Sequence, residues 1–403
     1  MDVEGIQVVF KKGEGGEEPL LFSPKEAESV RRFHRTMEDY RATPLRPLPG
    51  LAERLGVGRI FVKDESQRFG LNAFKALGGV YAVARLIGRM LGLPPDKLDF
   101  PTLKSGEVKE KIGEITLITA TDGNHGRAIA WAARQLGQRA VVYLPKGSAD
   151  IRVEAIRELG AEAFVTDLNY DDTVLLALNR AREQGWHMVQ DTAWEGYTDI
   201  PRWIMQGYMT MVHEALEQMG SEGASRPTHV FLQAGVGSMA ASVLGYLVMA
   251  FPDSIPTTTL VEPTRASCFL KSAAIGDGRP HTVGGDLKTS MAGLSCGVPN
   301  PIAWPILRDY CRAYAACHDY VTARGMRILG NPAGADPRII AGESGAVGLG
   351  LLSLIMERDG LAFMREKLDL NENSTVLFFS TEGDTDPENY RRIVWDGKYS
   401  SPA

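Results

Sequence analysis

The sequence predicts a two-domain α/β protein in which open, mostly parallel sheets are flanked by helices. Its 403 residues are too many for one ordinary hydrophobic core and suit two domains. A hydrophobic content of 44% with 23% charged residues is typical of a soluble globular protein. Apolar segments of strand and helix length alternate along most of the chain, which is the βαβ pattern of a parallel sheet covered on both faces.

The first half of the chain shows this alternation clearly. The apolar run from Arg59 to Val62 predicts a strand. Apolar residues at helical spacing from Asn72 to Met90 predict the next helix, with Lys75 in its first turn. Alternating strands and helices then follow at 116–121, 126–136, 140–143, 150–159, 162–166, 171–184 and 187–190.

The second half repeats the pattern. It predicts strands at 229–233, 258–261 and 375–379, a helix at 238–250 and a helix that begins near Gly345. Cys311, Cys317 and His318 fall on a stretch that we interpret as one amphipathic helix. Residues 1–16 are acidic and contain several glycines, so we expect a frayed terminus there.

Charge and composition argue against several partners. The net charge of -6 and the pI near 5.8 give no basic surface for nucleic acid. The longest apolar run, at 239–251, is shorter than the roughly 20 residues that a membrane span needs. No apolar signal core begins the chain, so we expect a cytoplasmic protein.

The four cysteines predict no metal site. They form no CxxC motif and have no histidine partner at zinc-finger spacing. A disulfide between Cys268 and Cys296 is sterically possible, but the cytoplasm disfavours it.

Lys75 is the first candidate for chemistry. A lysine amine in a partly desolvated pocket can form a Schiff base with an aldehyde, and pyridoxal phosphate (PLP) is the commonest biological aldehyde used in this way. The alternative is a solvated lysine on the exposed face of an amphipathic helix.

Two loops that lie between a strand and a helix are candidates for binding anions. Thr121 to Gly126 (Thr-Asp-Gly-Asn-His-Gly) places a helix N-terminus where a carboxylate or oxyanion can bind, although Asp122 or Asn124 could simply cap the helix. Gln233 to Ala240 (Gln-Ala-Gly-Val-Gly-Ser-Met-Ala) is a loop that can cradle phosphate. It also matches the dinucleotide pattern G-x-G-x-x-A, with Glu262 near the place of a ribose-binding acid.

The remaining motifs favour PLP over a dinucleotide. An NAD-dependent dehydrogenase leaves Lys75 and the loop around Asp122 without a role. PLP needs a lysine, a phosphate loop and polar groups around a pyridine ring, and Ser380 to Thr385 places two hydroxyls at the end of an apolar strand. The ends of parallel strands are where open α/β sheets bind ligands.

These motifs together resemble those of the diaminopropionate ammonia-lyase family, which belongs to the tryptophan-synthase-like, or fold type II, PLP enzymes. The resemblance runs from about residue 22 to residue 398. It is carried by the motifs at 70–75, 121–126, 169–172, 190–197, 233–237, 342–348 and 380–385. It implies a homodimer that converts either isomer of 2,3-diaminopropionate to pyruvate and two molecules of ammonia.

The resemblance also implies roles for the cofactor-binding residues. Lys75 would form the Schiff base with PLP and later act as the base for the L isomer. Asn124 would bond the phenolate oxygen of PLP, and Thr381 the pyridine nitrogen. The phosphate would be bound by the loop residues Ala234, Gly235, Val236, Gly237 and Ser238.

Two carboxylates carry the predictions about the substrate. The related serine and threonine dehydratases usually have serine where this chain has Asp122, so we expect Asp122 to be the base for the D isomer, on the face of PLP opposite Lys75. We assign Asp191 to the distal ammonium of the substrate, with a turn-capping acid as the alternative. His125 and Tyr170 are further substrate-binding candidates. Glu343 could stabilise the dipole of the helix that follows or support the site.

The predicted architecture is a larger PLP-binding domain, residues 1–87 and 192–403, with a smaller α/β domain, residues 88–191, inserted into it. We expect the cofactor in the cleft between them. A serine or threonine dehydratase of the same fold is the closest alternative. The others are an NAD-dependent dehydrogenase and a protein that binds PLP or an amino acid without turnover.

Overall fold

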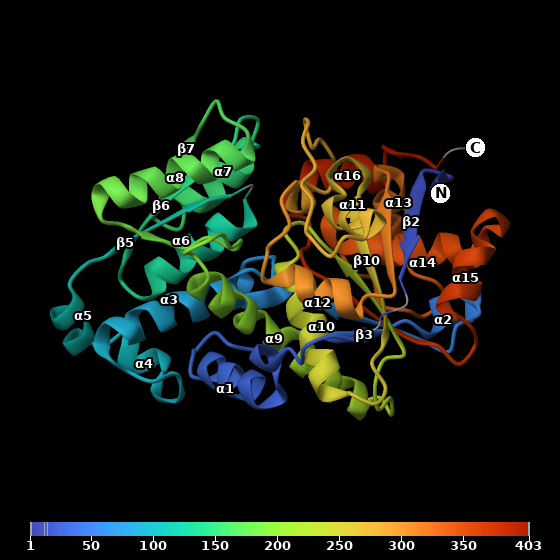
Figure 1. Cartoon of the computed structure of the whole chain (residues 1–403), viewed down its shortest axis with the longest axis horizontal. Helices are drawn as coiled ribbons and strands as arrows, with labels where there is room; N and C mark the ends of the chain where they lie inside the picture. Colours follow the sequence, from blue (N-terminus) through green and yellow to red (C-terminus); the bar gives the residue numbers. More distant parts are fainter. Residues whose placement is uncertain (1, 12, 14, 122, 402–403) are drawn as a thin grey trace. The chain divides into compact units, whose positions relative to one another are not determined.

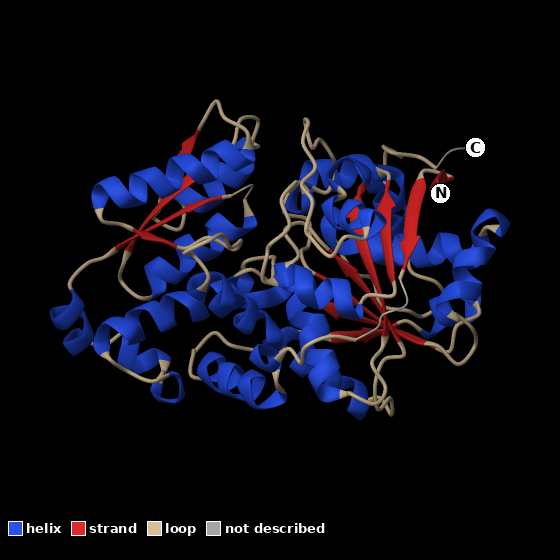
Figure 2. Ribbon diagram, in the orientation of Figure 1, coloured by secondary structure: helices blue, strands red, loops and turns tan. Residues whose placement is uncertain are grey.

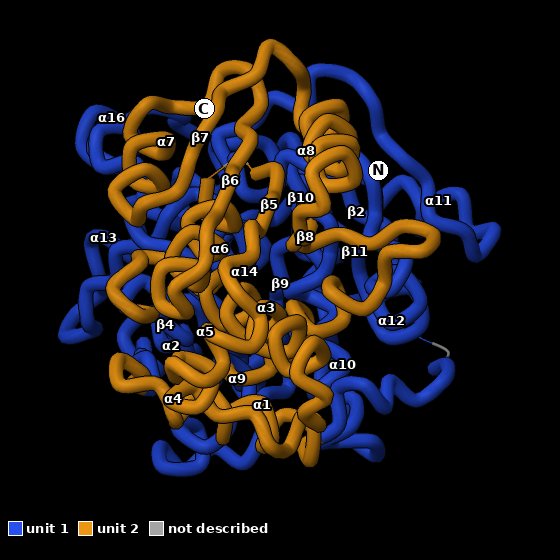
Figure 3. The backbone as a smooth tube through the Cα atoms, turned by 90° about the vertical axis from the view of Figure 1, so that its left-hand side faces the viewer, with its two compact units in different colours: residues 1–23, 42–67, 211–403 blue, residues 24–41, 68–210 orange. Residues whose placement is uncertain are grey.

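The computed structural model describes residues 2–11, 13, 15–121 and 123–401. It confirms the predicted α/β class with mostly parallel sheets flanked by helices. The chain divides into two compact units, coloured separately in Figure 3. Unit 1 comprises residues 1–23, 42–67 and 211–403, and unit 2 comprises residues 24–41 and 68–210.

Unit 1 contains an eight-stranded sheet in the order β1-β2-β11-β10-β9-β12-β4-β3. Figure 2 shows the strands in red. The five strands from β11 to β4 run parallel, whereas β1, β2 and β3 pair antiparallel at the two edges. The strands are β1 (Asp2–Val3), β2 (Ile6–Phe10), β3 (Leu45–Pro47), β4 (Arg59–Asp64), β9 (His229–Gln233), β10 (Thr257–Pro263), β11 (Ala313–Cys317) and β12 (Thr375–Ser380).

The central strands of this sheet are buried on both faces, which explains their continuous apolar sequences. The longer helices that cover them are α10 (Ser238–Ala250), α13 (Asp319–Gly330) and α14 (Glu343–Glu357). α14 packs against α13 and contacts β9 and β12. Shorter helices complete the unit: α2 (Pro49–Leu55), α11 (Cys268–Ile275), α12 (Ala303–Tyr310), α15 (Ala362–Leu368) and α16 (Pro387–Val394).

Unit 2 contains a four-stranded parallel sheet in the order β7-β6-β5-β8 (Figure 1). Its strands are β5 (Thr116–Ala120), β6 (Arg139–Leu144), β7 (Glu162–Val165) and β8 (His187–Met188). The helices are α1 (Pro24–Arg35), α3 (Ala76–Leu91), α4 (Phe100–Leu103), α5 (Gly106–Ile112), α6 (Asn124–Gln135), α7 (Asp150–Arg157) and α8 (Tyr170–Gln184). Right-handed crossovers place α6 and α7 on one face of this sheet and α8 on the other.

The structure corrects two sequence-based expectations. The stretch that contains Cys311 and Cys317 is not one helix: Cys317 ends the buried strand β11, and Cys311 precedes it. The small residues of Ala-Tyr-Ala-Ala-Cys resemble a helix in sequence, but full burial between neighbouring strands selects the extended form. Residues 2–10 are not frayed, because β2 pairs along the whole of β11.

The longest helix was not predicted. It is α9 (Asp199–Ser221), which runs from unit 2 into unit 1. No described helix is both long and apolar enough to cross a membrane.

The compact units have other bounds than the predicted domains. Unit 2 contains the predicted smaller segment, 88–191, and also residues 24–41 and 68–87 with Lys75. Compactness alone does not define a folding domain, so the predicted division stays a prediction.

A fully buried ion pair links β4 to α9 within unit 1. The ammonium of Lys63 donates to Oε2 of Glu214 at 2.7 Å, to the carbonyl of Thr43 at 2.6 Å and to Oε1 of Gln218 at 2.9 Å. All three ammonium hydrogens therefore have acceptors, which a buried cation requires.

We expect Lys63→Met to lower the free energy of unfolding by about 3 to 5 kcal/mol, because it leaves the Glu214 carboxylate buried without its cation. Urea denaturation followed by circular dichroism measures this loss. The matched control is Arg139→Met, which breaks the exposed Arg139 to Glu162 pair and should cost less than about 1 kcal/mol. Equal losses in the two variants would contradict the assigned role of burial.

Candidate active site

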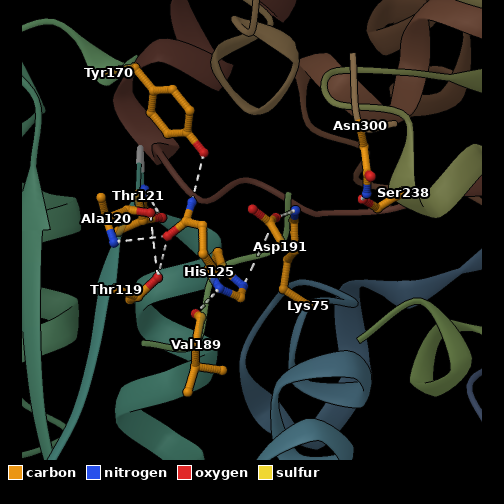
Figure 4. A network of polar contacts seen from close by, with 12 residues as sticks. Lys75, Thr119, Ala120, Thr121, His125, Tyr170, Val189, Asp191, Ser238 and Asn300 are labelled. Atoms are coloured by element: carbon orange, nitrogen blue, oxygen red, sulfur yellow. Dashed lines mark hydrogen bonds and ion pairs between the residues drawn. The ribbon is translucent and has the colours of Figure 1, made fainter. Parts of the chain in front are cut away.

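Lys75 lies at the start of α3, as predicted, and forms an ion pair with Asp191 (Figure 4). The Nζ atom also lies 5.4 Å from the ring centroid of Phe74 and 6.0 Å from that of Tyr208. The Asp191 side chain is almost fully buried, and that of Lys75 is one-fifth exposed. The amine thus sits in a partly desolvated, aromatic-lined environment, and the alternative of a solvated surface lysine is wrong.

The charges around Asp191 set its protonation. Burial by itself raises the pKa of the Asp191 carboxyl, but the nearby Lys75 ammonium and His125 outweigh it and hold this pKa at about 2. Burial lowers the pKa of His125, and Lys75 lowers it further, whereas Asp191 acts in the opposite direction. Asp191 is therefore ionised and His125 neutral near pH 7.

His125 has a defined tautomer. Its Nε2 atom lies 2.8 Å from the carbonyl oxygen of Val189, which can only accept a hydrogen bond. The proton of the neutral ring is therefore on Nε2. Nδ1 carries a lone pair and lies 4.0 Å from Oδ2 of Asp191.

Side chains end the pairing of β8 with β5. The main-chain ladder runs as far as the bond from the Val189 N–H to the carbonyl of Ile118, at 2.8 Å. A regular parallel ladder would continue with a bond from the N–H of Ala120 to the carbonyl of Val189. Instead His125 donates to that carbonyl, and the Ala120 N–H donates to Oε1 of Gln190 at 3.1 Å. The main-chain pairing ends here, two residues before Asp191.

The 121–126 loop follows β5, as predicted. The hydroxyl of Thr121 accepts a bond from the Gly123 N–H at 2.9 Å, and Asn124 is the first residue of α6. Gly123 is the N-cap, and no side chain of the described residues caps this helix. A helix N-terminus therefore follows the loop, as both the anion-binding and the capping interpretations require. Asp122 lies outside the described residues.

Tyr170 begins α8 behind its N-cap Asn169. Its hydroxyl oxygen accepts a bond of 3.0 Å from Nε2 of Gln190. The structure of unit 2 thus brings together Lys75, His125 and Asp191, residues that lie up to 116 positions apart. Tyr170 bonds the side chain of Gln190, the residue before Asp191.

The predicted phosphate loop, residues 234–238, joins β9 to α10 in unit 1. Gly237 has a φ of +89°, and a Cβ atom there would lie 2.4 Å from the ring of Phe269, so only glycine fits. Gly237 is also the N-cap of α10, which leaves the first N–H groups of that helix without a capping side chain. Ser238 accepts a bond of 2.9 Å from Nδ2 of Asn300.

Thr381 follows β12 and is buried beside Gln233. Nε2 of Gln233 donates to the carbonyl of Phe379 at 2.8 Å and to the Thr381 hydroxyl at 2.9 Å. Because a carbonyl can only accept, the amide orientation is fixed. The Thr381 oxygen is an acceptor toward Gln233, and its own hydrogen is directed elsewhere.

Two further acidic residues named in the sequence analysis each interact with the start of a helix. Glu262 is fully buried, and its carboxylate accepts bonds from the N–H groups of Phe269 and Leu270 at the start of α11. Burial raises the pKa of this carboxyl to about 8. Glu262 is therefore enclosed and cannot bind a ribose, as the dinucleotide interpretation requires. Glu343 lies in the first turn of α14, where an acid stabilises the helix dipole, and accepts a bond from Asn389.

Sequence analysis missed Gln190 and Asn300. Gln190 lies next to Asp191 but carries no charge that would single it out. Asn300 lies between two prolines, which is a turn signal, but no pattern in the sequence relates it to residue 238.

Comparison with known proteins identifies the relatives of the chain. Residues 36–381 match the model of the family described as pyridoxal-phosphate dependent enzyme. The chain is 54% identical, over 98% of both chains, to diaminopropionate ammonia-lyase from Escherichia coli strain K12. Crystal structures of the Escherichia coli lyase in complex with D-serine and with an aminoacrylate-PLP azomethine reaction intermediate superpose with TM-scores of 0.92 and 0.91. The identities are 52% and 51%, each over 98% of both chains.

The ion pair of Lys75 and Asp191 predicts a pH dependence of stability. The depressed pKa of Asp191 stabilises the folded state fully above the unfolded-state pKa of about 3.9, and this stabilisation is lost as pH falls toward about 2. In ligand-free protein, we expect Asp191→Asn to cost roughly 2 kcal/mol at pH 6 and progressively less below pH 4. Urea denaturation of both proteins at several pH values measures the difference. A difference that stays constant down to pH 2 would contradict the assigned pair.

Proposed function

Because the chain belongs to the pyridoxal-phosphate dependent enzymes and, within them, to the diaminopropionate ammonia-lyases, we propose that it converts 2,3-diaminopropionate to pyruvate and two molecules of ammonia. The reaction is an α,β-elimination that accepts the D and the L isomer. The observation that carries the proposal is the partly buried Lys75 amine, which is held by Asp191 at the start of α3.

The donor groups of the described residues fit PLP. Unit 2 supplies an amine in a partly desolvated environment, and unit 1 supplies a glycine loop at a helix N-terminus and a buried hydroxyl. When bound, PLP supplies an aldehyde that condenses with amines and a ring that withdraws electrons from the α-carbon of the substrate. Lys75 would hold the aldehyde end and the amides of residues 234–238 the phosphate.

Thr381 would bind the pyridine nitrogen of the cofactor. Its oxygen already accepts from Gln233, so its hydroxyl hydrogen is available for an acceptor such as an unprotonated ring nitrogen. A neutral hydroxyl does not force that nitrogen to be protonated, which favours rapid elimination over side reactions. Asn124, at the first position of α6, is the proposed partner of the phenolate oxygen.

Lys75 would also serve as the base for the L isomer. With the substrate bound to the cofactor, the Nζ atom of Lys75 would take the α-proton of the L isomer. Asp191 stabilises the resulting ammonium, because its carboxylate already pairs with Nζ in the structure.

Asp191 is further proposed to bind the distal ammonium of the substrate. The Asp191 carboxylate stays ionised at neutral pH. Its partner Lys75 would act first as the amine that holds the cofactor and then as the base. A charge-assisted bond from this carboxylate distinguishes diaminopropionate from serine, whose hydroxyl is neutral. His125, neutral and adjacent to Asp191, is a further part of the proposed substrate pocket.

We also propose that the protein is a cytoplasmic homodimer. Support comes from the sequence resemblance and from the four cysteines, all of which are free thiols in the structure.

A pyruvate assay with the D and L isomers of diaminopropionate and of serine tests the proposed activity. We expect pyruvate from both diaminopropionate isomers, with kcat/KM at least about tenfold above serine because Asp191 pairs with the distal ammonium. Lys75→Ala should abolish both pyruvate formation and the visible absorbance band that borohydride removes from the wild type. The matched control, Lys109→Ala on α5, should retain both. Pyruvate from serine alone would show a dehydratase instead.

Asp122→Asn tests the assignment of a second base. PLP is planar, so one base on the Lys75 side can remove the α-proton of only one enantiomer. We expect D-isomer turnover to fall by at least about 100-fold and L-isomer turnover to change by only a few-fold, measured as kcat for each isomer. Asp150→Asn, an exposed acid on α7, is the matched control and should affect neither. An equal loss for both isomers would reject the assignment.

A further inference from the structure

We propose that Tyr208, on α9, is a positioning residue for Lys75, and that its buried hydroxyl accepts a hydrogen bond from the Nζ atom of Lys75 during proton transfer. The inference rests on the proposed function, because it concerns Lys75 as the base for the L isomer. It goes beyond that function by assigning a role to an aromatic residue that lies outside all the sequence motifs.

The Tyr208 hydroxyl is a buried polar group that forms no hydrogen bond of ordinary geometry with the residues that the structure describes. The whole side chain is buried, so water does not satisfy the hydroxyl either. Such a group costs folding free energy, and phenylalanine would fill the same space without this cost. The hydroxyl therefore needs an explanation other than the stability of the ligand-free fold.

The charged groups around this hydroxyl are those of the Lys75 and Asp191 pair. Nζ of Lys75 lies 6.0 Å from the centroid of the Tyr208 ring. Burial raises the pKa of the Tyr208 phenol, and the Asp191 charge raises it further, whereas Lys75 lowers it through its positive charge and its approach to the hydroxyl. Because burial outweighs Lys75, the phenol stays protonated at neutral pH, beside an amine that can turn toward it.

Two glycines allow α9 to bring the Tyr208 ring against α3. A Cβ atom at Gly78, one turn after Lys75, would lie 2.5 Å from Cε1 of Tyr208. A Cβ atom at Gly207 would lie 2.5 Å from the carbonyl oxygen of Leu77. The close approach of the two helices thus holds the ring beside the first turn of α3. The flexible lysine chain is the part that can move to form the bond.

A second acceptor matters when Lys75 acts as a base. A neutral amine has two N–H groups and one lone pair, and the lone pair must point at the α-proton of the substrate. Asp191 accepts one N–H, as in the ion pair of the structure, and Tyr208 would accept the other. The direction of the lone pair is then fixed. The α-proton moves to Nζ, the C–H electrons remain on the substrate, and the new ammonium keeps both acceptors.

The ligand-free structure is consistent with a bond that forms only in the reaction. Catalytic hydrogen bonds are often long or poorly aligned in ligand-free enzymes and shorten when the substrate binds. Nζ of Lys75 is turned toward Asp191 in the structure. A buried hydroxyl that is held in place beforehand loses little freedom when the bond to Nζ forms.

Tyr208→Phe is the first test, measured as kcat and KM for each isomer of diaminopropionate. We expect kcat for the L isomer to fall by about 10- to 100-fold, because a hydrogen bond to the reacting amine is lost. KM for both isomers and kcat for the D isomer, whose proposed base is Asp122, should change by less than about threefold. The visible absorbance band should remain, because Lys75 itself is unchanged. A loss of equal size for both isomers, or no loss for the L isomer, would overturn the proposal.

The stability of the ligand-free protein is the second measurement. Tyr208→Phe should keep or raise the urea midpoint, because the hydroxyl has no partner in the described fold. Tyr197→Phe is the comparison: the Tyr197 hydroxyl accepts from the Gln190 N–H at 2.7 Å and donates to the Met188 carbonyl at 3.0 Å, so its loss should lower the midpoint. A lower midpoint for Tyr208→Phe would assign the hydroxyl to the fold and overturn the proposal.

The matched control for turnover is Tyr81→Phe. Tyr81 is also buried and lies on α3, but its hydroxyl accepts a bond of 3.2 Å from Arg85. Its substitution should leave kcat for both isomers unchanged. Wild-type protein that makes no pyruvate from diaminopropionate would refute the proposed function. An active wild type with the wrong pattern of variants would refute only the role of Tyr208.

Discussion

The ion pair between Lys75 and Asp191 is the interaction on which the candidate site depends. A primary amine in a partly buried, aromatic-lined environment keeps its charge only if an anion compensates for lost hydration. Asp191 provides this compensation. The pairing of β8 with β5 ends at Val189, so Asp191 lies outside the sheet ladder. No hydrogen bond is lost where the ladder stops, because side chains bond both main-chain groups. His125 donates to the carbonyl of Val189, and Gln190 accepts from the N–H of Ala120.

Both units use a buried glutamine in the same way. Gln190 in unit 2 and Gln233 in unit 1 each bond a backbone group that fixes the orientation of the amide. Each then donates its NH₂ group to a hydroxyl, Tyr170 in one case and Thr381 in the other. A hydroxyl rotates freely unless a neighbour constrains it, and a neutral amide does so without placing a charge beside the reacting groups.

The sequence predicted the parts of the site that follow local rules. Glycines that enter a helix, a lysine at a helix start and polar residues at the ends of apolar strands mark positions where parallel sheets bind ligands, and the structure places Lys75, residues 234–238 and Thr381 at such positions. The contacts of Gln190 and Asn300 were not predicted, because their partners are distant in sequence. The strand β11 was predicted as a helix for a related reason. Its alanines favour a helix locally, and only the neighbouring strands make the extended form preferable.

The pairing of β2 with β11 has a consequence for how molecules of this protein meet. β11 is rich in alanine, and without β2 its outer row of N–H and C=O groups would be open to any other strand. Residues 6–10 occupy that row within the same chain, and β1 pairs in turn with Ile6 and Gln7 of β2. Residues 6–10 thus keep the edge of β11 from pairing with another molecule, and loss of this strand by proteolysis would expose that edge.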